Sequence, residues 1–540
     1  MPGAQRLTEH NGTVWQQTVP LFFCGTLEGG MYMSQIRADH LTFGYDGSPE
    51  LVFENAGFTI DTEWKLGLVG RNGKGKTTLL RLITGELSAE GTLICSVPAA
   101  YFPYTVTPAQ MQRTAAEFAE ELRAGCELWR VICELSELCE NADILYRPFC
   151  TLSLGQRTKV LLAVLFSGDN DFLLIDEPTN HLDAQARENV RQYLSSKKGF
   201  ILVSHDRDLL DACTDHILVL NRRTIMVQNG NFSCWQENQQ RRDHFAQAEN
   251  EKHRKQILRL RQAAKRAAEW ADKSERSKIG FDPVKEPERC IGTRSFIGAK
   301  TKKMQSRVKN TERRIEREIS EQQGLLQDIE ETAALKMSPL THHKDTLITL
   351  RDCTLRYSDA DEPMCEGLTF SVRQGERIAL HGANGCGKST LMRVILQAAG
   401  ILPKDDSLIV SGVCETASQL TVSYVPQDTS FLHGSIPGFC DERGLDRSML
   451  CTVLRQLDLS RAQLAKDISE YSEGQKKKVL LAASLMTPAH LYIWDEPLNF
   501  IDIFSRMQIE DVLRAYMPTM LFAEHDIRFR NSISTDTVCF

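Results

Sequence analysis

Short apolar runs recur in both halves of the chain, and stretches with helical periodicity separate each run from the next. Nearly continuous apolar runs of four or five residues are typical of strands that are buried on both faces of a parallel sheet. The pattern therefore predicts two α/β domains, each with a mainly parallel sheet. The runs lie at 65–69, 172–175, 200–203, 377–380, 491–494 and 520–523.

Between these halves, residues 239–343 follow a different pattern. Apolar residues recur at spacings of three or four on one side of a Gly- and Pro-containing patch at 280–298, and more sparsely on the other. This spacing predicts two long helices joined by a loop, which together form a helical hairpin with its tip near 280–298. The residues that carry the pattern are Ile257, Leu260, Ala264, Ala267, Val308, Ile315 and Ile319.

These patterns divide the chain into four parts. We expect a first α/β domain at 33–238, the helical-hairpin linker at 239–343 and a second α/β domain at 344–540. Residues 1–32 lack clear periodicity, so we interpret them as an N-terminal extension that is either disordered or an artefact of the choice of start site. We assign no function to this extension.

The charge of the chain is distributed unevenly. The 540 residues carry 64 Lys and Arg against 71 Asp and Glu. This net charge of −7 excludes a protein that coats nucleic acid with a uniformly basic surface. Residues 241–320, however, hold 23 basic and 12 acidic residues, a local excess of +11. Because basic side chains neutralise phosphates, we expect the linker to contact RNA. The alternative is that the two helices are charged only because they are exposed to solvent, and that they do not contact RNA.

Composition also limits where the protein acts. The chain has no apolar run of 18 residues and no recognisable secretory signal, so we expect no transmembrane helix and no export. Its 16 cysteines include no C-x-x-C pair, which favours reduced thiols over zinc ligands or disulfides. We therefore expect a cytoplasmic protein.

A phosphate-binding motif occurs twice. Residues 70–77 and 382–389 both fit G-x-x-x-x-G-K-[ST], and each follows a predicted strand. In such a P-loop, backbone N–H groups cradle phosphates, the lysine reaches the β- and γ-phosphates, and the following hydroxyl binds Mg²⁺. The predicted ATP-binding residues are Gly70, Asn72, Gly73, Gly75, Lys76, Thr77 and Thr78 in the first loop, and Gly382, Asn384, Gly385, Gly387, Lys388, Ser389 and Thr390 in the second.

Paired carboxylates follow two of the apolar runs. Asp176 and Asp495 end these runs, so we expect them to join Thr77 and Ser389 as Mg²⁺ ligands. The glutamates that follow each aspartate can polarise the attacking water. Two histidines stand just past further runs at nearly the same offset, and we expect them to contact the γ-phosphate. The predicted catalytic residues are Glu177, Glu496, His205 and His525; a capping role for the carboxylates and a structural role for the histidines are the alternatives.

Residues 152–156 and 471–475 resemble the signature loops of ATP-binding-cassette ATPases. The serine of each loop lies 23 residues before the aspartate that ends the apolar run in its half, Asp176 or Asp495. In that family two cassettes pack head to tail, and the signature loop of one contacts the γ-phosphate bound by the other. The resemblance thus implies one site with Lys76 and Ser472 and a second with Lys388 and Ser153. It adds these ATP-binding residues: Ser153, Gly155, Gln156, Ser472, Gly474 and Gln475, with Tyr45 and Tyr357 stacking on adenine.

Two cassettes joined by a long charged hairpin resemble the ABC-F proteins, which are translation factors and ribosome-protection proteins, and the likeness covers residues 34–540. Residues 177–183 have the typical ABC-F form, while 496–502 and 518–525 look like the Lsa-type resistance branch. The resemblance implies a monomer that binds the ribosomal exit site, contacting large-subunit rRNA and P-site tRNA. It also implies protection against lincosamides, pleuromutilins and streptogramin A, with phenicols and oxazolidinones in related members.

The predicted hairpin tip differs from its stems because it carries apolar and aromatic side chains. We expect it to enter the peptidyl-transferase region; the alternative is that these residues pack the loop on itself. The residues concerned are Phe281, Ile291, Phe296 and Ile297.

The sequence also departs from the family pattern. Gln427 follows Val425-Pro426 and is a predicted Mg²⁺ ligand, but Tyr104 stands where the matching glutamine is expected, so the two sites are not equivalent. Leu154 and Glu473 stand where many cassettes have glycine. A housekeeping ABC-F translation factor is the main alternative function. The ATPase subunit of a membrane transporter and a non-catalytic scaffold are weaker alternatives.

Overall fold

A computed structural model describes residues 34–45, 51–169, 171–180, 182–220, 225–276, 335–358 and 362–540, together with Arg314 and Arg317. The chain divides into two compact units, which are described separately below. One unit comprises Met1–Ser233 and Ala333–Phe540, and the other is Cys234–Thr332.

Each half of the first unit is built on a mainly parallel sheet. The strand order is β5-β6-β7-β3-β8-β9 in the first half and β14-β15-β16-β12-β17 in the second. All neighbouring strands run parallel except β9, which is antiparallel to β8. The strands are β3 Lys65–Gly70, β5 Ala99–Phe102, β6 Phe172–Asp176, β7 Phe200–Val203, β8 His216–Leu220, β9 Ile225–Asn229, β12 Arg377–His381, β14 Val422–Val425, β15 Leu491–Asp495, β16 Met520–Ala523 and β17 Asp536–Cys539.

The apolar runs form the strands that they predict. Every residue of β7 and of β16 is buried, as is expected of strands covered on both faces. The predicted α/β class with two mainly parallel sheets is therefore confirmed.

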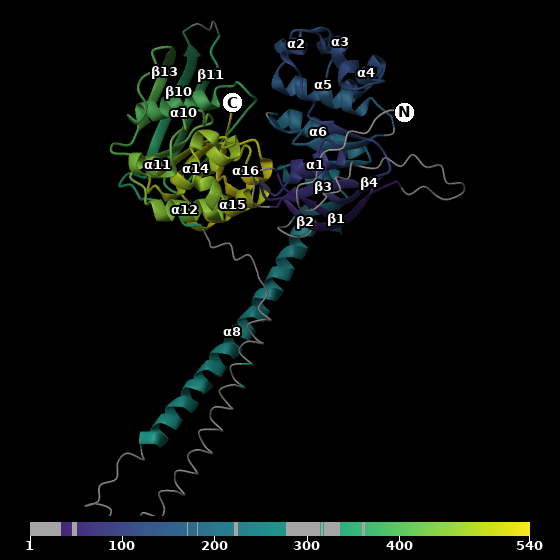
Figure 1. Ribbon diagram of the computed structural model, residues 1–540. Helices are drawn as coiled ribbons and strands as arrows, with labels where there is room; N and C mark the ends of the chain where they lie inside the picture. The colour runs from purple at the N-terminus through teal and green to yellow at the C-terminus, as the bar shows by residue number, and fades with distance from the viewer. Residues whose placement is uncertain are drawn as a thin grey trace, which may run out of the picture. The chain divides into compact units, whose positions relative to one another are not determined.

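Each half also has a three-stranded antiparallel sheet, which the apolar runs did not predict. The orders are β2-β1-β4 and β11-β10-β13. In the second half, α10 packs against β10 and β13 (Figure 1), so one core joins this sheet to the P-loop helix. The strands are β1 Gln35–Phe43, β2 Phe53–Asp61, β4 Glu90–Cys95, β10 Thr346–Tyr357, β11 Cys365–Arg373 and β13 Leu408–Thr416.

Helices connect the strands in a similar order in both halves. The first half contains α1 Lys76–Ile83, α2 Pro108–Met111, α3 Ala115–Leu122, α4 Leu128–Glu137, α5 Leu154–Phe166, α6 Ala184–Ser196 and α7 Arg207–Cys213, with 3₁₀ helices Ala142–Tyr146 and Phe149–Thr151. The second contains α10 Lys388–Ala398, α11 Ile436–Arg443, α12 Arg447–Gln456, α13 Arg461–Leu464, α14 Glu473–Met486, α15 Ile503–Tyr516 and α16 Ile527–Ile533, with the 3₁₀ helix Ile468–Glu470.

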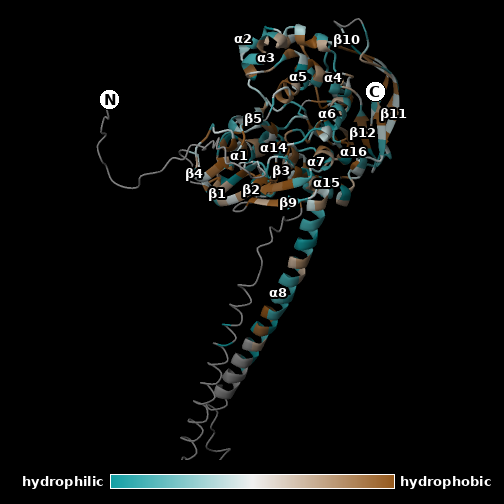
Figure 2. Ribbon diagram, turned by 90° about the vertical axis from the view of Figure 1, so that its right-hand side faces the viewer, coloured by the Kyte–Doolittle hydropathy of each residue, from teal (hydrophilic) through white to brown (hydrophobic). Residues whose placement is uncertain are grey.

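A long helix, α8 Phe232–Arg276, begins seven residues before the predicted linker. Much of the coloured part of its ribbon is hydrophilic in Figure 2, in agreement with the charged pattern of the sequence. The tip residues and most of the second predicted helix lie outside the described residues, as does the N-terminal extension. The hairpin with its tip therefore stays a prediction.

Two other expectations concern the whole chain. Among the described residues, no helix is both long enough and apolar enough to cross a membrane. The described cysteines are free thiols, as the sequence predicts.

Candidate functional site

Both P-loops connect a central strand to a helix. Gly75 and Gly387 precede the helices with φ of 89° and 100°, a backbone conformation that favours glycine. Lys76 Nζ donates to the carbonyl oxygen of Gly70 at 2.7 Å, and Lys388 Nζ donates to that of Gly382 at 3.0 Å. Each ammonium group thus points into its own loop, where a phosphate would receive it.

The hydroxyl and the carboxylate predicted to bind Mg²⁺ meet in the first site. Thr77 Oγ1 donates to Asp176 Oδ2 at 2.8 Å. In the second site, Asp495 Oδ1 is buried and has no hydrogen-bond partner among the described residues. Oxygen ligands of this kind suit Mg²⁺, so the residues present fit the ion.

Tyr101 is a further contributor to the first site that the sequence motifs do not identify. Tyr101 Oη donates to Asp176 Oδ2 at 3.1 Å from the neighbouring strand β5. Tyr424 stands at the same place in β14, where burial and the charge of Asp495 raise its pKa to about 12. This repetition of a tyrosine in both halves was the signal that could have identified the pair.

The two predicted catalytic glutamates share an uncommon backbone conformation. Glu177 and Glu496 have φ of 52° and 44°, in the left-handed region that non-glycine residues rarely adopt. Strain of this kind concentrates at functional sites. His205 Nε2 lies 3.3 Å from Glu177 Oε1, and His525 Nε2 lies 3.4 Å from Glu496 Oε1.

The electrostatics of the two glutamates differ. Burial, and then the charge of Asp176, raise the pKa of Glu177 to about 8. Burial also acts to raise the pKa of Glu496, but the nearby His525, Lys388 and Lys477 outweigh it, so this pKa is lowered. Gln427 Nε2 donates to Glu496 Oε2 at 2.9 Å. At neutral pH, Glu496 is therefore the stronger candidate for a general base.

Tyr104 does not replace the missing glutamine. Its buried hydroxyl lies beside the Arg123 guanidinium, which forms an ion pair with Asp171 at 2.6 Å. The phenol thus interacts with Arg123, whereas Gln427 contacts the predicted catalytic glutamate directly.

We expect the Tyr104→Gln substitution to raise hydrolysis at the first site and Gln427→Tyr to lower it at the second. Loss of a residue that orients a metal site typically costs about 10–100-fold in activity. The first change is measured in a Glu496→Gln background and the second in a Glu177→Gln background, so that one site reports at a time. If neither substitution changes the hydrolysis rate relative to its own background variant, the glutamine amide has no role at this position.

The two predicted adenine-stacking tyrosines are held by the P-loop helices. Tyr45 Oη shares a hydrogen bond of 2.8 Å with Thr78 Oγ1, and Tyr357 Oη shares one of 3.3 Å with Thr390 Oγ1. Tyr45 is 47% exposed, so its ring is accessible. Stacking on adenine stays a prediction.

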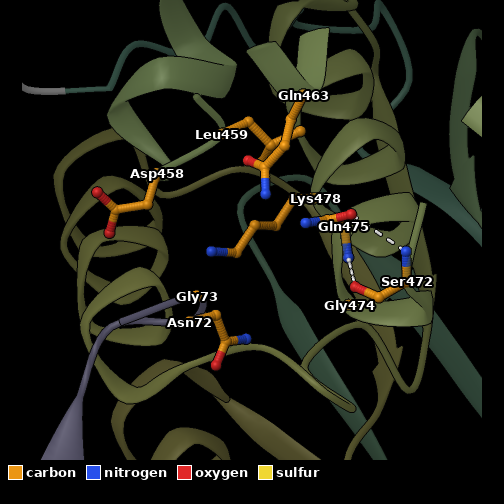
Figure 3. Close-up of a pocket in the computed structure, with 9 residues that line it drawn as sticks. All are labelled: Asn72, Gly73, Asp458, Leu459, Gln463, Ser472, Gly474, Gln475 and Lys478. Carbon is orange, nitrogen blue, oxygen red and sulfur yellow. Dashed lines mark hydrogen bonds between the residues drawn. The ribbon is translucent and has the colours of Figure 1, made fainter. Parts of the chain in front are cut away.

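A pocket of about 200 Å³ brings the first P-loop and the second signature loop together (Figure 3). Asn72 Nδ2 donates to the carbonyl oxygen of Phe500 at 3.2 Å, and Arg71 pairs with Asp458 at 2.6 Å. The volume is below the range of about 300–1,000 Å³ that is usual for ligand pockets, so a nucleotide needs a wider opening. The lining residues are Asn72, Gly73, Asp458, Leu459, Gln463, Ser472, Gly474, Gln475 and Lys478.

The signature serines also cap helices. Ser472 Oγ accepts from Gln475 N at 3.4 Å, while Gln475 Oε1 accepts from Ser472 N at 3.1 Å. Ser153 and Gln156 form the same capping box at the start of α5. His181 stands where Phe500 stands in the other half and lies outside the described residues, so the pairing of Ser153 with Lys388 stays a prediction.

We expect Gly474→Ala to disrupt the first site, while the control change Gly438→Ala in α11 is tolerated. A Cβ at Gly474 would lie 2.4 Å from the backbone oxygen of Phe500, which the atom cannot occupy. A Cβ at Gly438 would lie 3.5 Å from Ser435 Oγ, an ordinary contact. Overpacking of this kind costs about 1–3 kcal/mol, or roughly 5- to 150-fold in ATP affinity. Nucleotide titration of both variants gives the comparison, and equal affinities would contradict the expectation.

Comparison with known proteins agrees with this geometry. A family model described as "ABC transporter" matches residues 53–180 and 365–499. The ribosome protection protein VmlR of Bacillus subtilis is 27% identical over 90% of this chain and 83% of its own. The erythromycin resistance ATP-binding protein MsrA of Staphylococcus epidermidis is 29% identical over 87% of this chain and 90% of its own.

The fold is also similar to a solved structure. The archaeal ribosome recycling factor aABCE1 has a TM-score of 0.55 at 17% identity, over 93% of this chain and 87% of that one. The duplicated P-loops, the strand-end carboxylates and the two family matches lead to one conclusion. The chain contains two ATP-binding-cassette ATPase domains, which bind ATP and hydrolyse it, and it is similar to resistance proteins of the ABC-F type.

Proposed function

We propose that this protein binds ribosomes in an ATP-dependent manner at the exit site and protects them from antibiotics of the large subunit. The observation that carries the proposal is the similarity to VmlR, which extends over 90% of this chain and 83% of a protein named for ribosome protection. The similarity to MsrA, a protein named for erythromycin resistance, also supports a role in antibiotic resistance. The basic excess in residues 241–320 gives the linker the charge to contact rRNA and tRNA.

The proposed ATPase chemistry uses residues of both cassettes. Lys76 binds the β- and γ-phosphates in the first site, with the second signature loop on the opposite side. Glu177 and Glu496 accept a proton from water as its oxygen attacks the γ-phosphorus, the bond to ADP breaks, and His205 and His525 hold the phosphate. Mg²⁺, when bound by residues such as Thr77 and Asp176, would neutralise phosphate charge.

We further propose that the cassettes convert this chemistry into movement of the linker. ATP between a P-loop and the opposite signature loop stabilises the closed cassettes, and hydrolysis removes that bridge. A ligand shifts such an equilibrium only by its different affinity for the two states. Closure therefore reorients the linker, and hydrolysis is coupled to release from the ribosome.

The proposal is tested by cosedimentation with bacterial large subunits, with ATP, with ADP and without nucleotide. We expect binding that depends on ATP. Expression in a drug-sensitive bacterium then gives the spectrum, for which lincosamides, pleuromutilins and streptogramin A are the first choices, followed by phenicols and oxazolidinones. A protein that fails to bind in every nucleotide state contradicts the proposal.

A housekeeping ABC-F translation factor is the second candidate, because the same ATPase chemistry serves it. Growth with and without drug separates the two functions. Bound ribosomes and a growth effect without drug, together with unchanged susceptibility, would favour the translation factor over a resistance protein.

The predicted hairpin tip offers a more specific test. We expect Phe296→Ala with Ile297→Ala to abolish drug protection and to leave ATPase activity unchanged, since the tip is remote in sequence from both P-loops. The matched control replaces Ile257 and Leu260, which belong to the predicted stem, by alanine. Drug susceptibility and ATPase rates are measured for each, and unchanged susceptibility of the tip variant would count against its role.

A further inference from the structure

Three charged side chains connect the second cassette to the start of the linker helix. Arg528 lies on α16, three residues after His525. Its Nη2 contacts Asp211 Oδ2 at 2.7 Å, and its Nε contacts Asp208 Oδ1 at 3.1 Å. Asp208 and Asp211 both belong to α7 of the first cassette, which begins two residues after His205. The two helices that follow the predicted catalytic histidines are therefore bound to each other.

Asp211 also holds the first turn of α8. Its Oδ1 accepts a hydrogen bond from Ser233 N at 2.7 Å, and its Oδ2 accepts one from Ser233 Oγ. Backbone N–H groups at the start of a helix have no partner within the helix, so an acceptor at this place stabilises the first turn. One carboxylate thus serves both the ion pair with Arg528 and the start of α8.

The other end of α16 is connected to both ATP sites. Asp526 caps α16 through Phe529 N at 2.9 Å and pairs with Arg506 at 3.1 Å. The positive charge of Arg506 in turn acts on Glu177 in the first site. His525, directly before Asp526, faces Glu496 in the second site. A shift at either site can therefore reach α16 through its N-terminal end.

We propose that Arg528 is a positioning residue that transmits the nucleotide state of the cassettes to the linker helix by its ion pair with Asp211. When α16 moves in one direction, Arg528 pulls the Asp211 carboxylate away from Ser233, and the cap of α8 weakens. When α16 moves back, Asp211 is released, and the cap strengthens. This inference rests on the proposed function, because it assigns residues to the coupling between ATP and the linker. It goes beyond the proposed function because it names the residues through which the cassettes and the linker helix are coupled.

A purely structural role for the pair is the alternative. Arg528 is 36% exposed, and ion pairs that water reaches contribute little to stability. Variants of this pair should therefore fold, and their effect should be on coupling. In a merely structural contact, the variants would change the protection of α8 equally with and without nucleotide.

The test is hydrogen exchange of the α8 first turn in the full-length protein, with Mg²⁺ and with or without ATP. We expect ATP to change the exchange rate at residues 233–236, and Arg528→Gln to reduce this ATP-dependent change by about fivefold or more. Asp211→Asn should act in the same way, because its amide oxygen still accepts from Ser233 N while the charge is lost. Arg528→Lys, which keeps the charge, should restore part of the response.

The matched control is Arg447→Gln, which removes a solvent-exposed ion pair with Asp441 inside the second cassette. This variant should respond to ATP like the wild type. The inference is overturned if Arg528→Gln and Asp211→Asn also respond like the wild type, or if ATP leaves the α8 amides unchanged in the wild type. Because the measurement needs no ribosome, a failure to bind ribosomes would contradict the proposed function and leave this result intact.

Discussion

Replacement of both predicted catalytic glutamates, Glu177→Gln with Glu496→Gln, is expected to reduce ATP hydrolysis by about 10²–10⁴-fold, the usual contribution of a general base. Glutamine keeps the size and polarity of the side chain but cannot accept a proton from water. ATP binding should persist, because the P-loops and signature loops are unchanged. The variant should therefore remain on ribosomes in the presence of ATP, as measured by phosphate release and by cosedimentation.

Two comparisons make this expectation specific. A Lys76→Ala, Lys388→Ala variant removes the ammonium groups that face the P-loop carbonyls, so it should lose nucleotide binding as well as hydrolysis. It should then fail to accumulate on ribosomes. A glutamine variant that hydrolyses ATP at the wild-type rate would show that neither carboxylate is the base.

The apolar pattern identified three inner strands of each mainly parallel sheet but none of the strands of the antiparallel sheets. Strands such as β7 are buried on both faces, so every position is apolar and the run is visible in the sequence. In β13, Ile409 and Val410 are 40% and 39% exposed. Apolar residues here do not report burial, and the strand is defined by its pairing with β10, which is distant in the sequence.

The residues of the candidate site also fall into two groups, those that the sequence predicts and those that only the fold brings together. The P-loops and the strand-end carboxylates are short motifs whose spacing is fixed by local geometry, so they could be identified from the sequence. Tyr101 reaches Asp176 only because β5 and β6 are neighbours in the sheet. Arg528 and Asp211 are 317 residues apart, and no local pattern predicts that they meet.

The different pKa values of the two glutamates lead to a pH prediction for the single-site variants. In Glu496→Gln only the first site hydrolyses ATP, and its base, Glu177, has a pKa of about 8. The base must be deprotonated to accept a proton, so activity is lost as the pH falls below 8. We expect kcat/KM, which reports the free enzyme, to be about 50-fold lower at pH 6 than at pH 8.

The Glu177→Gln variant should behave differently because its only base is Glu496. The contact with His525 lowers the pKa of Glu496 below its usual value, so this carboxylate is fully ionised from pH 6 to pH 8. Its kcat/KM should therefore change little over that interval. The ratio of the two profiles cancels any titration that ATP or the shared groups contribute. Parallel profiles would mean that the burial of Glu177 and the charge of Asp176 do not set the protonation of the first site.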